Sequence, residues 1–107
     1  MVEYRIPIKL PSLLNMRASW RAISKLKKAQ RLATRIALNG LVVPPMPCVV
    51  TITRIGPRRL DDDNLAGACK YVRDQIATMI GVDDGSPLYT WRYEQVIGRY
   101  GVVVTIR

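Results

Sequence analysis

The chain has no histidine and only two cysteines among its 107 residues, and both shortages narrow the chemistry that it can perform. Cys48 and Cys69 are isolated and form no Cys-x-x-Cys pair, so the nitrogen and sulfur ligands of a zinc site are missing. Nucleases that use histidine as the general base are excluded as well. Any metal ion must be held by oxygen atoms, which favours Mg²⁺ or Mn²⁺. Both cysteines lie in apolar segments, where we expect reduced and buried thiols.

Long apolar runs are also missing. No stretch approaches the roughly 20 apolar residues of a membrane-spanning helix, and the N-terminal segment alternates like a strand rather than a signal peptide. We therefore expect a cytoplasmic protein with no membrane partner. Hydrophobic residues make up 49% of the sequence, which is enough for residues 1–107 to form one folded domain.

Acidic residues are scarce outside one short window. The chain carries 17 Lys and Arg against 8 Asp and Glu, a net charge of +9. All of its aspartates lie within residues 61–84, namely Asp61, Asp62, Asp63, Asp74, Asp83 and Asp84. Two carboxylates ~5 Å apart repel each other by about 3 kcal/mol at an effective dielectric near 20, so such a cluster tends to bind a cation. A basic protein with one acidic spot suits a protein that binds a polyanion and places a divalent metal on it.

The pattern of apolar residues predicts a small α/β domain with the order β-α-β-α-β-β and a mixed sheet. We expect helices over 17–38 and 64–80, and strands over 2–10, 48–55, 88–97 and 101–107. The first strand contains Pro7 and is expected at an edge, and the last two strands are expected to form a hairpin. Residues 102–106 could then supply an edge for self-pairing. Tyr89, Trp91 and Tyr93 share one strand face, where a sheet core or a dimer interface is favoured over a base-stacking platform.

The first helix is predicted to have an apolar and a basic face. Ala22, Ile23, Leu26, Ala29, Ala33, Ile36 and Ala37 fall on one side at ~100° per residue. Arg17, Arg21, Lys25, Lys28, Arg31 and Arg35 fall on the opposite side. Such a stripe is explained by an ordinary solvated surface or by phosphate binding. It has no interleaved acid, and nucleic acid is therefore the expected anionic partner.

The aspartates before the second helix have two interpretations. Asp61 and Asp63 are two residues apart in expected extended chain, so their carboxylates face the same way and suit a metal ion. Alternatively, Asp63 or Asn64 caps the helix, and the other carboxylates only add solubility. A cap is worth ~1 kcal/mol and explains one aspartate rather than three. Farther along, Lys70 and Asp74 lie four residues apart, where an i,i+4 ion pair is the simplest explanation.

These residues carry a resemblance to a known family. Asp61-x-Asp63-Asn64, then Lys70-x-x-x-Asp74, then Asp83-Asp84 resembles the motif of the RusA family of Holliday-junction resolvases. The opening segment Leu10-Pro11-Ser12, with Asn15 and Trp20-Arg21, is similar to that family as well. The commoner family pattern has a lysine at the position of Gly67. Lys70 lies three residues later, ~4.5 Å farther along a helix.

The resemblance implies a Mg²⁺-dependent endodeoxyribonuclease (Mn²⁺ is the alternative ion) that works as a homodimer and cleaves branched DNA such as a four-way junction. Asp61, Asp63 and Asp84 are the implied catalytic metal ligands, with Asp83 as the alternative to Asp84. Lys70 is the implied catalytic residue that neutralises charge on the phosphate or helps to orient water. The expected DNA-binding residues are Arg17, Arg21, Lys25, Lys28, Arg58 and Arg59. We expect a role in DNA recombination and repair and no small-molecule cofactor. The alternatives are a non-catalytic basic nucleic-acid-binding module and a nuclease for other flaps or branches.

Overall fold

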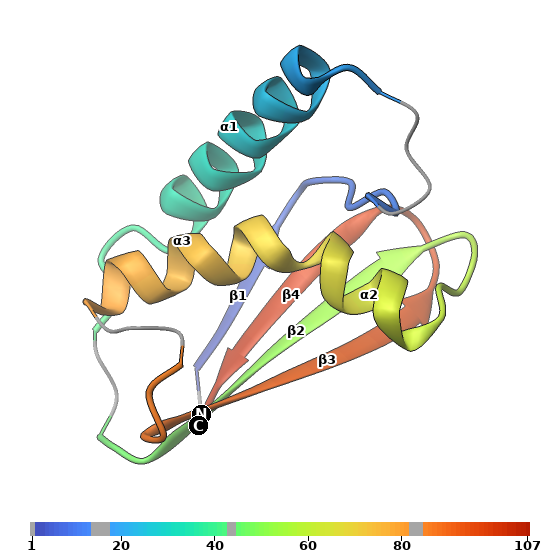
Figure 1. Ribbon diagram of the computed structural model, residues 1–107. Helices are drawn as coiled ribbons and strands as arrows, with labels where there is room; N and C mark the ends of the chain where they lie inside the picture. Colours follow the sequence, from blue (N-terminus) through green and yellow to red (C-terminus); the bar gives the residue numbers. More distant parts are fainter. Residues whose placement is uncertain (1, 14–17, 43–44, 82–84) are drawn as a thin grey trace.

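The computed structural model describes residues 2–13, 18–42, 45–81 and 85–107 (Figure 1). Its elements are β1 (Val2–Ile6), α1 (Trp20–Ala37), β2 (Cys48–Gly56), α2 (Asp62–Ala68), α3 (Lys70–Ile80), β3 (Tyr89–Ile97) and β4 (Gly101–Ile106). The predicted α/β order and mixed sheet are confirmed. The expectation of two helices is wrong, because the second predicted helix is divided at Cys69 into α2 and α3. Gly67, a weak helix former, lies two residues before this division.

The four strands form one sheet in the order β1-β4-β2-β3. β2 and β3 are parallel, because α2 and α3 form the crossover that a parallel pair requires. β4 then pairs antiparallel with the free side of β2 and with β1. The predicted hairpin is therefore wrong, since β2 lies between β3 and β4. The suggested self-pairing edge at 102–106 is also wrong, because β4 is paired on both sides.

β1 is an edge strand, as Pro7 predicted. It ends at Ile6, one residue before that proline, instead of continuing to residue 10. The predicted alternation nevertheless continues past the end of the strand, because Ile6 and Leu10 are fully buried and Ile8 is half-buried.

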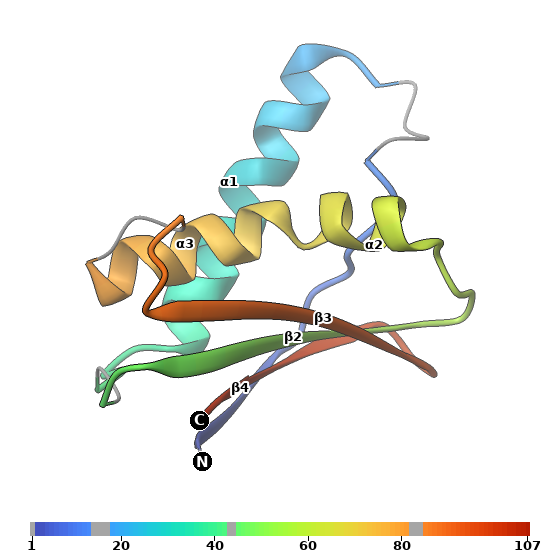
Figure 2. The same cartoon turned by 60° about the horizontal axis from the view of Figure 1, so that its bottom comes forward.

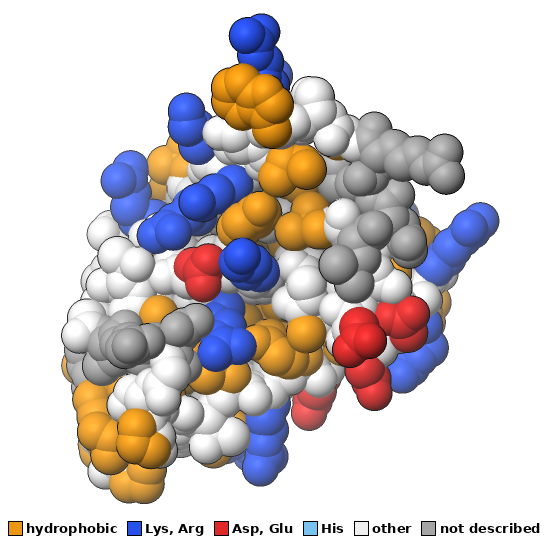
Figure 3. Space-filling model, in the orientation of Figure 1, with side chains coloured by type: hydrophobic (Ala, Val, Ile, Leu, Met, Phe, Trp, Pro, Cys, Tyr) orange, Lys and Arg blue, Asp and Glu red, His pale blue; other side chains and the backbone are white. Residues whose placement is uncertain are grey.

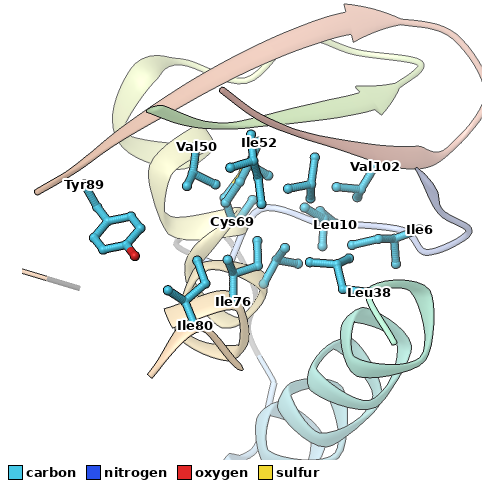
Figure 4. Close-up of a cluster of buried hydrophobic side chains, with 14 of the residues drawn as sticks. Ile6, Leu10, Leu38, Val50, Ile52, Cys69, Ile76, Ile80, Tyr89 and Val102 are labelled. Carbon is cyan, nitrogen blue, oxygen red and sulfur yellow. The ribbon is translucent and has the colours of Figure 1, made fainter. Parts of the chain in front are cut away.

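The helices all lie on one face of the sheet, so the molecule has two layers and one core (Figure 2). The side chains between the layers are mostly aliphatic, and Val50 and Ile52 of β2 lie among them (Figure 4). Val50, Ile52 and Val104, all on the central strands, are 0% exposed. Tyr89 belongs to this cluster, and Trp91 and Tyr93 pack against it. These aromatic side chains are thus part of the sheet core. Cys48 and Cys69 are free and buried, as expected.

The orientation of α1 agrees with the prediction in part, because Ala33 and Ala37 pack against the core as expected. The helix starts at Trp20 after Ser19, whose side chain accepts a hydrogen bond from the backbone N–H of Ala22. Its buried residues are Gln30 and Thr34, whereas Ile36 is 66% exposed. Ala22 and Ala29, also predicted on the buried face, are exposed.

The buried face of α1 is rotated from the predicted one because α3 packs against α1 and is its main neighbour. Arg31, predicted on the free basic face, donates from Nε to Gln75 Oε1 at 3.0 Å and from Nη2 to Thr78 Oγ1 at 3.2 Å. The polar bonds therefore turn Arg31 toward α3 and move the apolar side chain of Ile36 outward. No helix in the described ranges is long and apolar enough to span a membrane.

Candidate metal and nucleic-acid site

The chain that leads into the aspartates is fixed by a side chain of the neighbouring strand. Gln95 of β3 accepts a hydrogen bond from the N–H of Leu60 at 2.9 Å and donates to the carbonyl of Leu60 at 2.7 Å. The amide thus pairs with both backbone groups of Leu60, as a further strand residue would. Leu60 directly precedes Asp61, so this contact with β3 fixes where the turn that contains Asp61, Asp62 and Asp63 begins. We call this segment the acidic turn.

Asp61 is the N-cap of α2, and the prediction that Asp63 or Asn64 caps the helix is wrong. Its Oδ1 accepts from the backbone N–H of Asn64 at 2.9 Å and from the Asn64 side-chain amide at 2.9 Å. Asp62 and Asp63 form the first turn of the helix rather than extended chain. All three carboxylates are exposed, and Oδ2 of Asp61 takes part in neither bond. The helix start therefore presents the carboxylates of Asp61 and Asp63 to solvent.

Asn64 also connects the aspartates to the N-terminal segment. The hydroxyl of Ser12 donates to Asn64 Oδ1 at 2.5 Å. The two residues are 52 positions apart in the sequence, so this bond joins the segment after β1 to the start of α2. Ser12 and Asn64 both belong to the motifs on which the resemblance rests. The structure brings these two motifs into contact.

Lys70 is exposed at the first position of α3, beyond the division between the two helices. Asp63 and Lys70 therefore lie on different helices, α2 and α3. Among the described residues, Lys70 and Asp74 form no ion pair, so the simplest explanation of their spacing is wrong. Lys70 remains free to interact with a ligand.

The predicted DNA-binding residues that the structure describes lie on two parts of the molecule, helix α1 and the loop before α2. Figure 3 shows acidic side chains gathered over α2, and basic side chains along α1 on the same face of the molecule. Exposed cations of that helix include Arg21, Lys25 and Lys28. Arg58 and Arg59 are exposed before the aspartates, and Arg59 lines a shallow pocket of about 320 Å³ together with Asp62, Tyr93 and Glu94. Arg17 lies outside the described residues.

A buried cation, Arg54, lies beneath the loop that leads to the site. It is 4% exposed and donates from Nε to the carbonyl of Leu10 at 2.7 Å and from Nη1 to the carbonyl of Arg58 at 2.9 Å. Burial raises the pKa of the Cys69 thiol to about 12, and the positive charge of Arg54 opposes this shift. Through its two hydrogen bonds, Arg54 connects β2 with the segment after β1 and with the loop before α2.

The donor atoms at the site fit a hard divalent cation. Asp61 and Asp63 supply carboxylate oxygens, which are the ligands that Mg²⁺ and Mn²⁺ prefer. Within the described ranges, no three acidic or cysteine side chains come together as a metal-binding group. Asp83 and Asp84, from which the expected third ligand comes, lie outside those ranges.

Comparison with known proteins gives no relative: no family model matches the chain, and neither a curated protein nor a solved structure matches it significantly.

Sequence reasoning missed three residues that organise this site, namely Gln95, Arg54 and Ser12. Each acts through a bond to a residue at least 35 positions away, and no local pattern reveals such a bond. The only signal in the sequence was the presence of Ser12 within the opening segment that resembles the RusA family.

Proposed function

We propose that the protein is a metal-dependent endodeoxyribonuclease that cleaves branched DNA, of the type that resolves Holliday junctions in recombination and repair. The observation that supports this most is the pair of exposed carboxylates, Asp61 and Asp63, in one turn that Gln95 and Asn64 hold in place. The rest of the chain is strongly basic, which favours a polyanionic substrate. The cytoplasm is the proposed location.

The residues have separate roles in the proposed reaction. Asp61, Asp63 and Asp84 would hold Mg²⁺ or Mn²⁺, with Asp83 as the alternative to Asp84. Such an ion, when bound, polarises a phosphate and lowers the pKa of water. Lys70, exposed at the start of α3, would neutralise charge on the phosphate. Asn64 keeps Oδ1 of Asp61 occupied, which orients the carboxylate and leaves Oδ2 for a ligand.

The test of the proposed activity is a cleavage assay on an end-labelled four-way junction in Mg²⁺ and in EDTA. We expect cuts near the branch point with Mg²⁺ and none with EDTA. A linear duplex of the same sequence serves as the substrate control and should be cut more slowly. A junction that stays intact at every metal concentration would contradict the proposal.

A non-catalytic nucleic-acid-binding module is the second candidate, because one observation favours it. Asp61 acts as a helix cap, which gives this carboxylate a structural reason to be present. Under this alternative, the protein binds the junction equally well in Mg²⁺ and EDTA and leaves all four strands intact.

Neutralising two cations of α1 is expected to weaken DNA binding in a salt-dependent way. In Arg21→Gln/Lys25→Gln, the slope of log K against log salt should become shallower by about 2 units, because two phosphate contacts are lost. The measurement is a band shift or fluorescence anisotropy titration at several salt concentrations. Arg5→Gln/Arg92→Gln removes the same charge from exposed positions on the strands and should leave the slope unchanged. Equal slopes in all three proteins would show that the α1 cations are only solvated.

The proposed partner within the assembly is a second copy of the chain. A four-way junction needs two opposed incisions, and an isologous dimer supplies two sites at a fixed separation. We expect light scattering at micromolar concentration to give twice the 12.1 kDa mass of the chain. Dilution should reduce paired cuts before it reduces single nicks. A monomer that makes symmetric paired cuts would contradict the dimer.

A further inference from the structure

A pocket beside the aspartates has a strongly positive lining. It measures about 460 Å³ and lies between the segment that follows β1, the C-terminal end of β2 and the loop before α2. Its lining residues are Lys9, Pro11, Ser12, Arg54, Pro57, Arg58, Leu60 and Tyr100. Three of these described residues are cations and none is acidic. A small concave site of this charge favours an anionic ligand.

Arg54, the most buried cation of the pocket, has no anionic partner among the residues that the structure describes. It is 4% exposed, and its hydrogen bonds within the described structure go to two carbonyl oxygens, of Leu10 and Arg58. A buried charge is costly unless a counter-charge compensates it, and an arginine cannot lose its proton in a protein. Carbonyl dipoles provide hydrogen bonds but no net negative charge.

The nearby thiol does not provide that charge either. The pKa of Cys69 is raised to about 12 by burial, so the thiol stays neutral near pH 7 even though Arg54 favours the thiolate. The positive charge of Arg54 therefore remains uncompensated by the described residues around it.

The backbone leaves room for the guanidinium group. A Cβ atom at Gly56 would lie 2.8 Å from Nη1 and 2.9 Å from Nη2 of Arg54, so a side chain there would displace the guanidinium group from its present position. At the mouth of the pocket, Lys9 is exposed with its Nζ 4.6 Å from the centre of the Tyr100 ring. Arg58 is exposed as well. The pocket thus combines one fixed cation with two solvent-facing ones.

We propose that this pocket binds an oxyanion of the phosphate class, with Arg54 at its inner wall and Lys9 and Arg58 at its mouth. Arginine donates to phosphate oxygens through its planar group, and lysine adds a point charge.

The pocket is connected to the acidic turn by a short chain of hydrogen bonds. Ser12 lines the pocket and donates to Asn64, and Asn64 donates to Oδ1 of Asp61. The bound group is then a backbone phosphate next to the one that is cleaved, an identification that rests on the proposed function. The oxyanion site itself does not depend on it.

The test follows the Nε–Hε signal of Arg54 by nuclear magnetic resonance in ¹⁵N-labelled protein, with EDTA present. Inorganic phosphate is titrated in one arm and a thymidine dinucleotide with one phosphodiester in the other, each against sodium chloride at equal ionic strength. We expect a saturable shift of the Arg54 signal. A response to both probes identifies a nucleic-acid phosphate as a ligand, and a response to inorganic phosphate alone supports a site for the free ion.

Charge-matched variants decide whether the pocket is responsible. Lys9→Gln/Arg58→Gln should weaken binding by about tenfold or more, because two charge-assisted contacts are lost. Lys27→Gln/Arg92→Gln removes one lysine and one arginine elsewhere, including a lysine that also lies over a tyrosine ring, and should bind like the unaltered protein. No saturable shift, or equal weakening in both variants, would overturn the site. Loss of nuclease activity alone leaves this result unaffected, because the titration contains no metal.

Discussion

Asp63→Asn is expected to lower the rate of junction cleavage by about 100-fold or more while binding of the junction persists or becomes tighter. The substitution removes one anionic ligand of the proposed metal, so transition-state stabilisation by the ion is lost. It also removes one negative charge that repels the phosphates, which favours binding. Asparagine is tolerated in the first turn of α2, so folding should be retained. Cleavage and band-shift assays on one labelled junction measure both effects.

The neighbouring Asp62→Asn is the matched control. This substitution also replaces a carboxylate with a neutral amide, one residue away in the same exposed helical turn. Asp62 lines the shallow pocket with Arg59 and Glu94 and has no proposed role with the metal. We expect cleavage within about threefold of the unaltered rate, since surface substitutions outside a site have small effects. Full activity in Asp63→Asn, or equal losses in both variants, would contradict the assignment.

Val104→Ala is expected to lower the free energy of unfolding by about 2 kcal/mol, through lost burial of two methyl groups and the cavity that they leave. Val104 is 0% exposed and points from β4 toward the helices. Val103, the preceding residue on the same strand, is half-buried on the opposite face of the sheet. Val103→Ala should cost less than about 1 kcal/mol.

The comparison of these two variants tests the two-layer arrangement, because the chemistry of the substitution is identical. Urea unfolding of both proteins, with equal slopes against denaturant, gives the two free energies. A larger cost for Val103→Ala than for Val104→Ala would show that the core lies on the other face of the sheet.

The local pattern of the sequence predicted most elements of the fold. Alternation placed β1, and Pro7 predicted the edge of the sheet correctly. Strand order was not predictable in the same way, because pairing depends on contacts between distant segments. β4 pairs with the free side of β2 rather than with the free edge of β3, and no turn signal at 98–101 reveals this choice.

The buried face of α1 was predicted only in part, for a related reason. Helical periodicity alone grouped Ile36 with the buried residues and Arg31 with the exposed ones. The bonds of Arg31 to Gln75 and Thr78 reverse this order, and they depend on where α3 lies. A sequence pattern contains no information on which neighbour a polar side chain finds.

The candidate site was predictable in its acidic residues but not in its supporting residues. Three adjacent aspartates in a basic chain indicate a candidate site from the sequence alone. Their local structure was predicted incorrectly, since Asp61 rather than Asp63 or Asn64 caps the helix. The pairing of Gln95 with Leu60 and the bonds of Arg54 join segments far apart in the chain, so only the folded structure reveals them.

Binding of Mn²⁺ to the free protein, measured by electron paramagnetic resonance, tests the central claim most directly. The signal of the hydrated ion decreases when protein ligands replace water, so the titration gives the affinity without DNA. We predict saturable binding by the unaltered protein and by Asp62→Asn, and at least about tenfold weaker binding by Asp61→Asn and Asp63→Asn, which each lose one carboxylate ligand. Absence of binding by the unaltered protein, or equal affinity in all four proteins, would contradict a metal site at these aspartates.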